Sequence, residues 1–177
     1  MACAFLLSGI TSYGQVAGSA EEFKAQMEVI LKDFANNFSN ISGAENIHES
    51  DEEYGYRVYN SLVQLGNAEE LYMENDFFNK TYSFYAGFPG SPDPEITLKA
   101  FRTLLDQIEA IKFSYYPLIR GEDKVDGNKH QVIFMPDADN SQLDPAFKEQ
   151  IIVVYLDRAI KTNNEGKIVW IPYIRFL

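Results

Sequence analysis

The sequence contains very little cysteine and histidine. Its only cysteine is Cys3, and its only histidines are His48 and His130. A single cysteine excludes an internal disulfide framework and any zinc site built on paired cysteines. The glycine-rich phosphate loops GxxxxGKS/T and GxGxxG are absent, and so is the serine elbow GxSxG. These absences exclude the commonest nucleotide-binding and serine-hydrolase signatures, and we expect no cofactor.

Positive charge is scarce relative to negative charge. The chain carries 15 Lys and Arg against 26 Asp and Glu, which gives a formal net charge of −11 and a pI of about 4.6. Such a surface disfavours nucleic acid and anionic membranes as partners. Hydrophobic residues make up 46% of the 177 residues, which is enough for the core of one domain. Long hydrophobic runs are missing, so we expect no integral membrane span.

Residues 1–14 carry no charge and contain the short apolar run from Ala2 to Leu7, followed by small residues. This pattern resembles the second half of a secretory signal peptide, but the basic region that normally comes first is missing, as it would be if the true start codon lay upstream. We expect residues 1–14 to be removed and residues 15–177 to form one exported globular domain, periplasmic or extracellular. The alternatives are a buried N-terminal strand or helix, and a lipoprotein acylated at Cys3.

Two stretches have the apolar spacing of amphipathic helices. Ser19 and Glu22 form a capping-box pattern before a predicted helix over residues 20–40. Asp93 and Pro94 are typical of the cap and first position of a second helix, which must end before Pro117. The apolar face of this second helix is expected to contain Leu98, Phe101, Leu104, Leu105, Ile108 and Ile111.

Other stretches are rich in β-branched and aromatic residues, as strands are. They cover residues 56–65, 70–74, 80–88, 131–135, 151–156 and 168–176. The segments between them are polar, and residues 121–129 are expected to form a charged loop. Because strands and helices do not alternate, we predict an α+β fold in which two amphipathic helices pack on a mainly antiparallel sheet of five to six strands. The predicted order is α-β-β-β-α-β-β-β.

The last two strands are apolar at consecutive positions, so both faces of this predicted hairpin should contact other groups. Pro172 interrupts the final strand, and proline has no N–H to donate to a neighbouring strand. Prolines are therefore confined to edges, strand starts or bulges. We expect the final strand to lie at the sheet edge, with a bulge as the alternative.

Candidate site residues are few. Aromatic side chains on a sheet face can bind apolar or sugar-like ligands, and the candidates are Tyr82, Tyr85, Tyr155 and Tyr173. His130 is a weak candidate for a general acid or base, since no partner stands near it in a known motif. Asp137, Asp139 and Asp144, with Asn140, resemble part of a calcium loop, but the required glycine and the final glutamate are missing. A solvated turn explains that segment better, and no metal site is expected.

Three functions are consistent with these observations. The first is an exported, non-enzymatic domain that binds a protein partner or small ligand through a sheet face or edge. The second is a small exported hydrolase that uses carboxylates and His130. The third is an oligomerising structural module. The sequence defines neither the ligand nor the oligomeric state.

Overall fold

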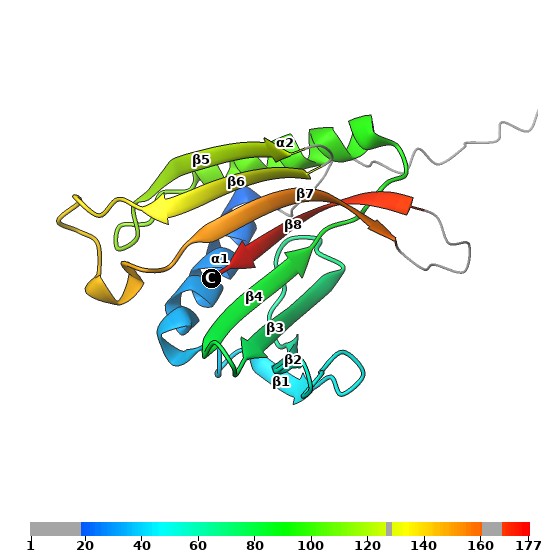
Figure 1. The fold of residues 1–177 in the computed structure, drawn as a ribbon. Helices are drawn as coiled ribbons and strands as arrows, with labels where there is room; N and C mark the ends of the chain where they lie inside the picture. The colour runs from blue at the N-terminus through cyan, green and yellow to red at the C-terminus, as the bar shows by residue number, and fades with distance from the viewer. Residues whose placement is uncertain (1–18, 127–128, 161–167) are drawn as a thin grey trace, which may run out of the picture.

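The computed structural model describes residues 19–126, 129–160 and 168–177 (Figure 1). The elements are α1 (Ala20–Asp33), η1 (Phe34–Asn36), β1 (Ser42–Glu45), β2 (Tyr56–Ser61), β3 (Glu70–Asp76), β4 (Thr81–Gly87), α2 (Pro94–Ala110), β5 (Leu118–Asp126), β6 (Lys129–Pro136), η2 (Pro145–Phe147), β7 (Ile152–Ile160) and β8 (Ile168–Phe176). The eight strands form one antiparallel sheet in the order β1-β2-β3-β4-β8-β7-β6-β5. The expected signal segment, residues 1–14, and most of the expected turn between β7 and β8 lie outside the described residues.

The predicted sheet of five to six strands is wrong, because the sheet has eight, in the order α-β-β-β-β-α-β-β-β-β. The two missed strands, β1 and β5, are the two edges of the sheet. The expected charged loop at residues 121–129 is largely β5, whose side chains are nearly all exposed. An edge strand is held by backbone hydrogen bonds to a single neighbour and needs no apolar pattern. Hydrophobic periodicity therefore gave no sign of either strand.

Helix α1 begins as predicted but ends earlier than residue 40. The Ser19 side chain accepts a hydrogen bond from the backbone N–H of Glu22, as the capping box requires. The helix ends at Asp33, and Asn37 and Phe38 have the positive φ angles of 53° and 57° that reverse the chain. Phe38 is nevertheless fully buried. Its apolar spacing thus reflects burial in the turn and not a longer helix.

Helix α2 confirms the prediction. Asp93 caps it by accepting a hydrogen bond from the backbone N–H of Glu95, and Pro94 is its first residue. Both helices lie on the same face of the sheet (Figure 1), and their apolar side chains join one core with alternate strand residues. That core includes Phe23, Met27, Phe101, Leu105, Phe84, Val154, Ile174 and Phe176. The opposite face of the middle strands is not covered by either helix.

Strand β8 lies in the middle of the sheet, between β4 and β7, so the expected edge position of Pro172 is wrong. The Pro172 carbonyl accepts a hydrogen bond from Phe88 N–H at 3.0 Å. The nitrogen and the carbonyl oxygen of one strand residue point to the same side, so the Pro172 nitrogen is also directed toward the chain just after the end of β4 at Gly87. The next backbone bonds join Ser91 and Trp170, which shifts the register by one residue. The proline therefore lies opposite an irregular stretch, where a missing donor is tolerated.

The architecture repeats itself. A helix followed by four strands occurs twice, and the two four-stranded halves meet along β4 and β8. This arrangement brings β3, β4, β8 and β7 side by side in the centre, although their sequence positions are far apart. Neither described helix is long and apolar enough to cross a membrane.

Candidate functional site

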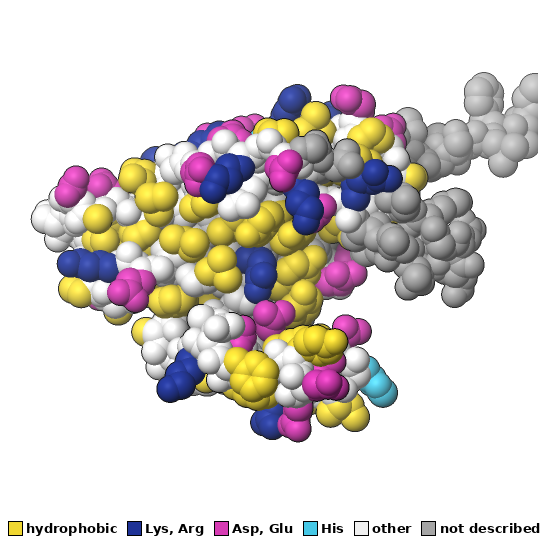
Figure 2. Space-filling view, viewed as in Figure 1, with side chains coloured by type: hydrophobic (Ala, Val, Ile, Leu, Met, Phe, Trp, Pro, Cys, Tyr) yellow, Lys and Arg dark blue, Asp and Glu magenta, His cyan; other side chains and the backbone are white. Residues whose placement is uncertain are grey.

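Four tyrosines lie in a row on the uncovered face of the central strands. Tyr72 comes from β3, Tyr85 from β4, Tyr173 from β8 and Tyr155 from β7, and we call this row the tyrosine ladder. Successive side chains of a strand point to opposite faces, so these tyrosines alternate with the core residues beneath them. Figure 2 shows hydrophobic side chains, a class that includes tyrosine there, gathered over the middle of this face.

The ladder is held together by ring stacking. Tyr72 lies directly opposite Tyr85, and their ring centroids are 4.5 Å apart with an interplanar angle of 18°. Tyr155 and Tyr173 are likewise opposite, at 4.7 Å and 17°. The two pairs meet through Tyr85 and Tyr173, whose centroids are 5.2 Å apart. Because the rings face one another across neighbouring strands, the ring faces that lie between two neighbours are covered within the row.

A glycine makes the central contact possible. Gly87 is the residue of β4 that lies opposite Tyr173. A Cβ atom added at Gly87 would lie 2.9 Å from the hydroxyl oxygen of Tyr85, so the Tyr85 ring leans along its strand over this glycine. The missing side chain leaves the space in which Tyr85 reaches Tyr173.

Burial raises the pKa of three ladder hydroxyls, those of Tyr72, Tyr85 and Tyr173, and so favours their neutral form. Burial, the largest cause, raises the pKa of Tyr72 to about 12 and that of Tyr173 to about 12. Burial also raises the pKa of Tyr85, with further contributions from Tyr72 and Glu70. Neutral phenols can both donate and accept hydrogen bonds. The ladder therefore combines apolar ring surface with uncharged polar groups near neutral pH.

Charged groups stand beside the ladder. Arg175 lies directly opposite Tyr85, and its Nη2 atom donates to Ser83 Oγ at 2.9 Å and to Glu74 Oε1 at 3.3 Å. The Arg175 side chain is 33% exposed, and its Nε atom is buried without a partner among the described residues. A guanidinium held on one side in this way still presents donors to solvent or to a ligand.

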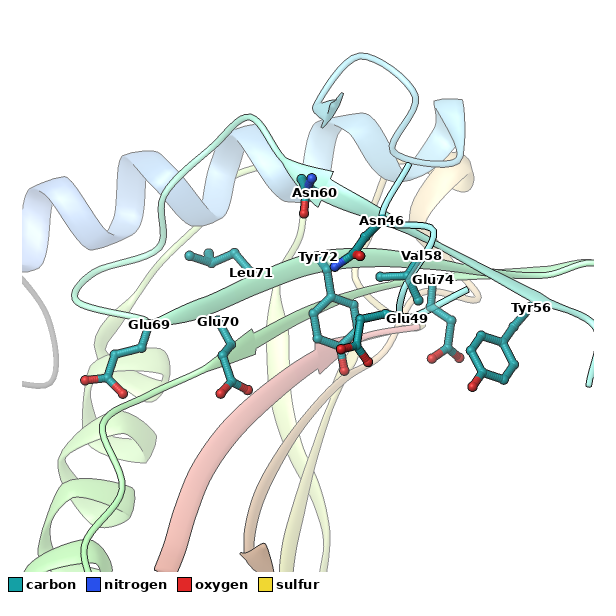
Figure 3. A pocket seen from close by; sticks show the side chains of 10 residues that line it. All are labelled: Asn46, Glu49, Tyr56, Val58, Asn60, Glu69, Glu70, Leu71, Tyr72 and Glu74. Atoms are coloured by element: carbon teal, nitrogen blue, oxygen red, sulfur yellow. The ribbon is translucent and has the colours of Figure 1, made fainter. Parts of the chain in front are cut away.

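Two cavities open along the ladder and share Tyr72 and Glu74. The smaller, about 300 Å³, lies over β3, β4, β7 and β8 and is lined by Tyr85, Tyr173 and Arg175 among others. The larger, about 630 Å³, lies between β2, β3 and the loop that follows β1 (Figure 3). Sites for small ligands usually measure about 300–1,000 Å³. A third cavity, of about 460 Å³, lies between α1 and α2 on the other side of the molecule.

Three of the four candidate tyrosines, Tyr85, Tyr155 and Tyr173, are therefore neighbours in the ladder. Tyr82 is not, because it packs against the core on the helix-covered face. Sequence analysis missed Tyr72 as a site residue. The turn that joins β3 and β4 spans residues 77–80. Counting back from this short turn pairs Tyr72 with Tyr85, but the predicted strand over residues 70–74 ended too early for this pairing to be seen.

His130 lies in a different place, at the β5–β6 edge. Its Nε2 atom is 2.7 Å from Asp123 Oδ1, and Arg120 donates to the other carboxylate oxygen of Asp123 at 2.8 Å. Burial is the largest single effect on the Asp123 carboxyl and acts to raise its pKa. Hydrogen bonds from His130 and Arg120 act in the opposite direction, and the net result is a lowered pKa. The imidazole also packs on Phe101, with centroids 4.8 Å apart. His130 lines none of these three cavities.

The calcium candidates form local turns. Asp137 accepts a hydrogen bond from the backbone N–H of Asp139 at 3.3 Å, Asn140 accepts one from Gln142, and Asp144 caps η2 through Ala146 N–H. Side chains used in this way satisfy nearby backbone donors. Among the described residues, no group of three or more His, Cys, Asp or Glu side chains is arranged to hold a metal ion.

Comparison with known proteins adds no assignment to this geometry: no protein-family model, curated protein or solved structure matches the chain.

Proposed function

We propose that this chain is a small exported binding domain that holds a small organic ligand against the tyrosine ladder. The observation that carries the proposal is the row of four stacked tyrosines on a sheet face that neither α1 nor α2 covers. Ligand sites combine aromatic walls with a few placed polar groups. The ladder supplies the walls, and Arg175, Glu74 and Ser83 supply polar groups beside it.

The sheet face is a better candidate for binding than the sheet edges. Edge strand β1 is short, and edge strand β5 is rich in charge and has a register shift between Arg120 and Asp123. Short length, charge and bulges are the features by which proteins prevent unwanted strand pairing at edges. Sedimentation at several protein concentrations tests the oligomerising alternative, for which we expect a constant monomer mass.

A ligand screen tests the binding proposal. A ligand that binds only the folded state stabilises it by RT ln(1 + L/Kd), where L is the free ligand concentration, so the unfolding temperature rises as ligand is added. We expect hits whose effect disappears in the double variant Tyr85→Leu with Tyr173→Leu and persists in Tyr54→Leu, a control at an exposed tyrosine outside the ladder. Hits that bind the ladder variant as tightly as the unchanged protein would refute the assignment of this face.

Export rests on residues 1–14, and its test is separate. Mass spectrometry of the protein isolated from its native host should show a chain that begins near Gln15. An intact Met1 on the exported protein would contradict the signal-peptide interpretation.

One observation favours the second candidate function, a hydrolase. His130 has an acidic partner, Asp123, at the distance that orients a catalytic imidazole. His130 does not line any of the three cavities described above, which makes the hydrolase the second candidate. Hydrolysis of a panel of ester and amide substrates that is lost in His130→Ala would make the hydrolase the better assignment.

A further inference from the structure

The larger cavity lies at one end of the tyrosine ladder. Tyr85 covers the face of the Tyr72 ring that points toward β4. The cavity is on the opposite side of Tyr72, toward β2, where the residue directly across is the exposed Asn60. The outer face of the Tyr72 ring therefore forms part of a cavity wall and is not covered by another ring of the ladder. Tyr56 contributes a second aromatic side chain to the same lining.

The charged residues that line this cavity are all glutamates, and one of them, Glu74, also pairs with Arg175 outside the lining. Of the ten described residues that line it, four are glutamates and none is a lysine, arginine or histidine. Figure 3 shows that the carboxylates of Glu49, Glu69, Glu70 and Glu74 extend on the same side of β3 as the Tyr72 ring. After burial, Glu74, Glu70 and Glu49 raise the pKa of Tyr72 and Arg175 lowers it, so these carboxylates act at the ring against one nearby positive charge. Glu70 and Glu74 belong to β3, Glu69 immediately precedes that strand, and Glu49 lies in the loop before β2, so the fold brings Glu49 to the other three.

We propose that this cavity binds a small organic cation, with its ammonium group seated against the outer face of Tyr72 and its charge balanced by the carboxylate of Glu49. The negative face of an aromatic ring attracts a cation within about 6 Å, and recognition of quaternary ammonium ligands by aromatic side chains depends on this attraction. The inference rests on the proposed function, because Tyr72 belongs to the same ladder, and it specifies the ligand class at one end of it.

An organic cation fits the wall better than a bare metal ion does. A calcium ion requires about six to eight oxygen ligands in a close shell. The described residues include no cluster of three acidic or histidine side chains with such an arrangement. The cavity of about 630 Å³ instead pairs carboxylates with aromatic and apolar surface, including the buried Val58. This combination suits a cation that carries carbon groups.

The test is isothermal titration calorimetry of the full chain with matched probes. Choline is the cation, 3,3-dimethylbutan-1-ol is its uncharged carbon analogue, and calcium chloride is the metal probe. We expect choline to bind and the other two probes not to bind. Binding should weaken as salt is added, because exposed carboxylates are screened.

Variants locate the binding. Tyr72→Leu should weaken choline binding by about tenfold or more, whereas Tyr72→Phe keeps the ring face and should retain most of the affinity. Glu49→Gln should weaken it by a few-fold, while Glu53→Gln, at an exposed glutamate that does not line the cavity, should leave it unchanged. Thermal unfolding of each variant establishes that it is folded, and Glu49→Gln against Glu53→Gln serves as the test if Tyr72→Leu is not.

Equal binding of the uncharged analogue, or no binding of choline at millimolar concentration, would overturn the inference. The proposed function would survive that result if a ligand from the screen still required Tyr85 and Tyr173. If no ligand of any charge depended on those two residues, the proposed function itself would fail. The two failures are therefore distinguishable.

Discussion

The ring of Tyr155 stacks on the ring of Tyr173 at 4.7 Å, in directly opposed positions of β7 and β8. The two residues are neighbours in space because β7 and β8 keep one register along their whole described length. The pair forms one end of the tyrosine ladder, on the face of the sheet that the helices leave uncovered.

This stacked pair should show a measurable coupling energy. Aromatic pairs contribute about 0.5–1.5 kcal/mol beyond the area that they bury. A double-mutant cycle with Tyr155→Leu and Tyr173→Leu, measured by urea unfolding, should give a coupling in this range. The matched cycle of Tyr173→Leu with Tyr82→Leu should give a coupling near zero, because Tyr82 lies on the opposite face. Equal couplings in the two cycles would contradict the stacking account.

Stability should fall in alkaline solution because of the ladder. Burial raises the pKa of Tyr72 and Tyr173 to about 12, whereas a tyrosine in the unfolded chain titrates near about pH 10. The unfolded chain thus loses these protons first as the pH rises. The contribution of the neutral hydroxyls to the free energy of unfolding is therefore complete below about pH 10 and is lost as the pH rises to about 12. The free energy of unfolding, measured by urea titration across this range, should decline less steeply in the variant Tyr72→Phe with Tyr173→Phe.

A single methyl group at Gly87 should disturb the centre of the ladder. The added Cβ of Gly87→Ala would lie 2.9 Å from the Tyr85 hydroxyl oxygen, so the Tyr85 ring must move away from Tyr173. We expect changed NMR shifts for the ring protons of both tyrosines. In a Tyr85→Leu background the same glycine substitution should leave the Tyr173 ring signals in place. A shift of equal size in both backgrounds would show that the effect does not pass through Tyr85.

Helix α2 should depend on Leu105 for its packing. Leu105 is 5% exposed in the core beneath the sheet. Leu105→Ala should lower the free energy of unfolding by about 2–5 kcal/mol, the range found for buried leucines. Ile96→Ala, in the first turn of the same helix and 36% exposed, is the control and should cost about 0.5 kcal/mol or less. A cost for Leu105→Ala as small as that of the control would mean that α2 packs differently.

The turn after α1 should depend on Asp33. This buried carboxylate accepts hydrogen bonds from the backbone N–H groups of Asn40 at 2.9 Å and Ile41 at 3.2 Å. Asp33→Ala leaves both donors without this acceptor, and we expect a loss of about 1–3 kcal/mol in the free energy of unfolding. Asp33→Asn, which keeps one carbonyl acceptor, should lose less. Similar losses for the two variants would assign the effect to the removed charge.

Some features followed from the sequence alone because their causes are local. The caps at Ser19 and Asp93 depend on side chains within three residues of the helix start, so the pattern was sufficient to place both helix beginnings. The strand over residues 80–88 was likewise placed by its own β-branched and aromatic residues, before the neighbours of that strand were known. The end of α1 was predicted too late, since the apolar spacing continues through Phe38 while the backbone turns.

Other features depended on which strands pair, and no local pattern carries that information. The edge strands β1 and β5 exist because a neighbour accepts their backbone hydrogen bonds, whatever their side chains are. Pro172 is compatible with a central strand because β4 ends opposite it, more than 80 residues away in the chain. The candidate site has the same origin. The sequence alone determined that the chain is rich in tyrosine, but only the pairing of β3, β4, β8 and β7 aligned four of these tyrosines and left one ring face beside a cavity lined with glutamates.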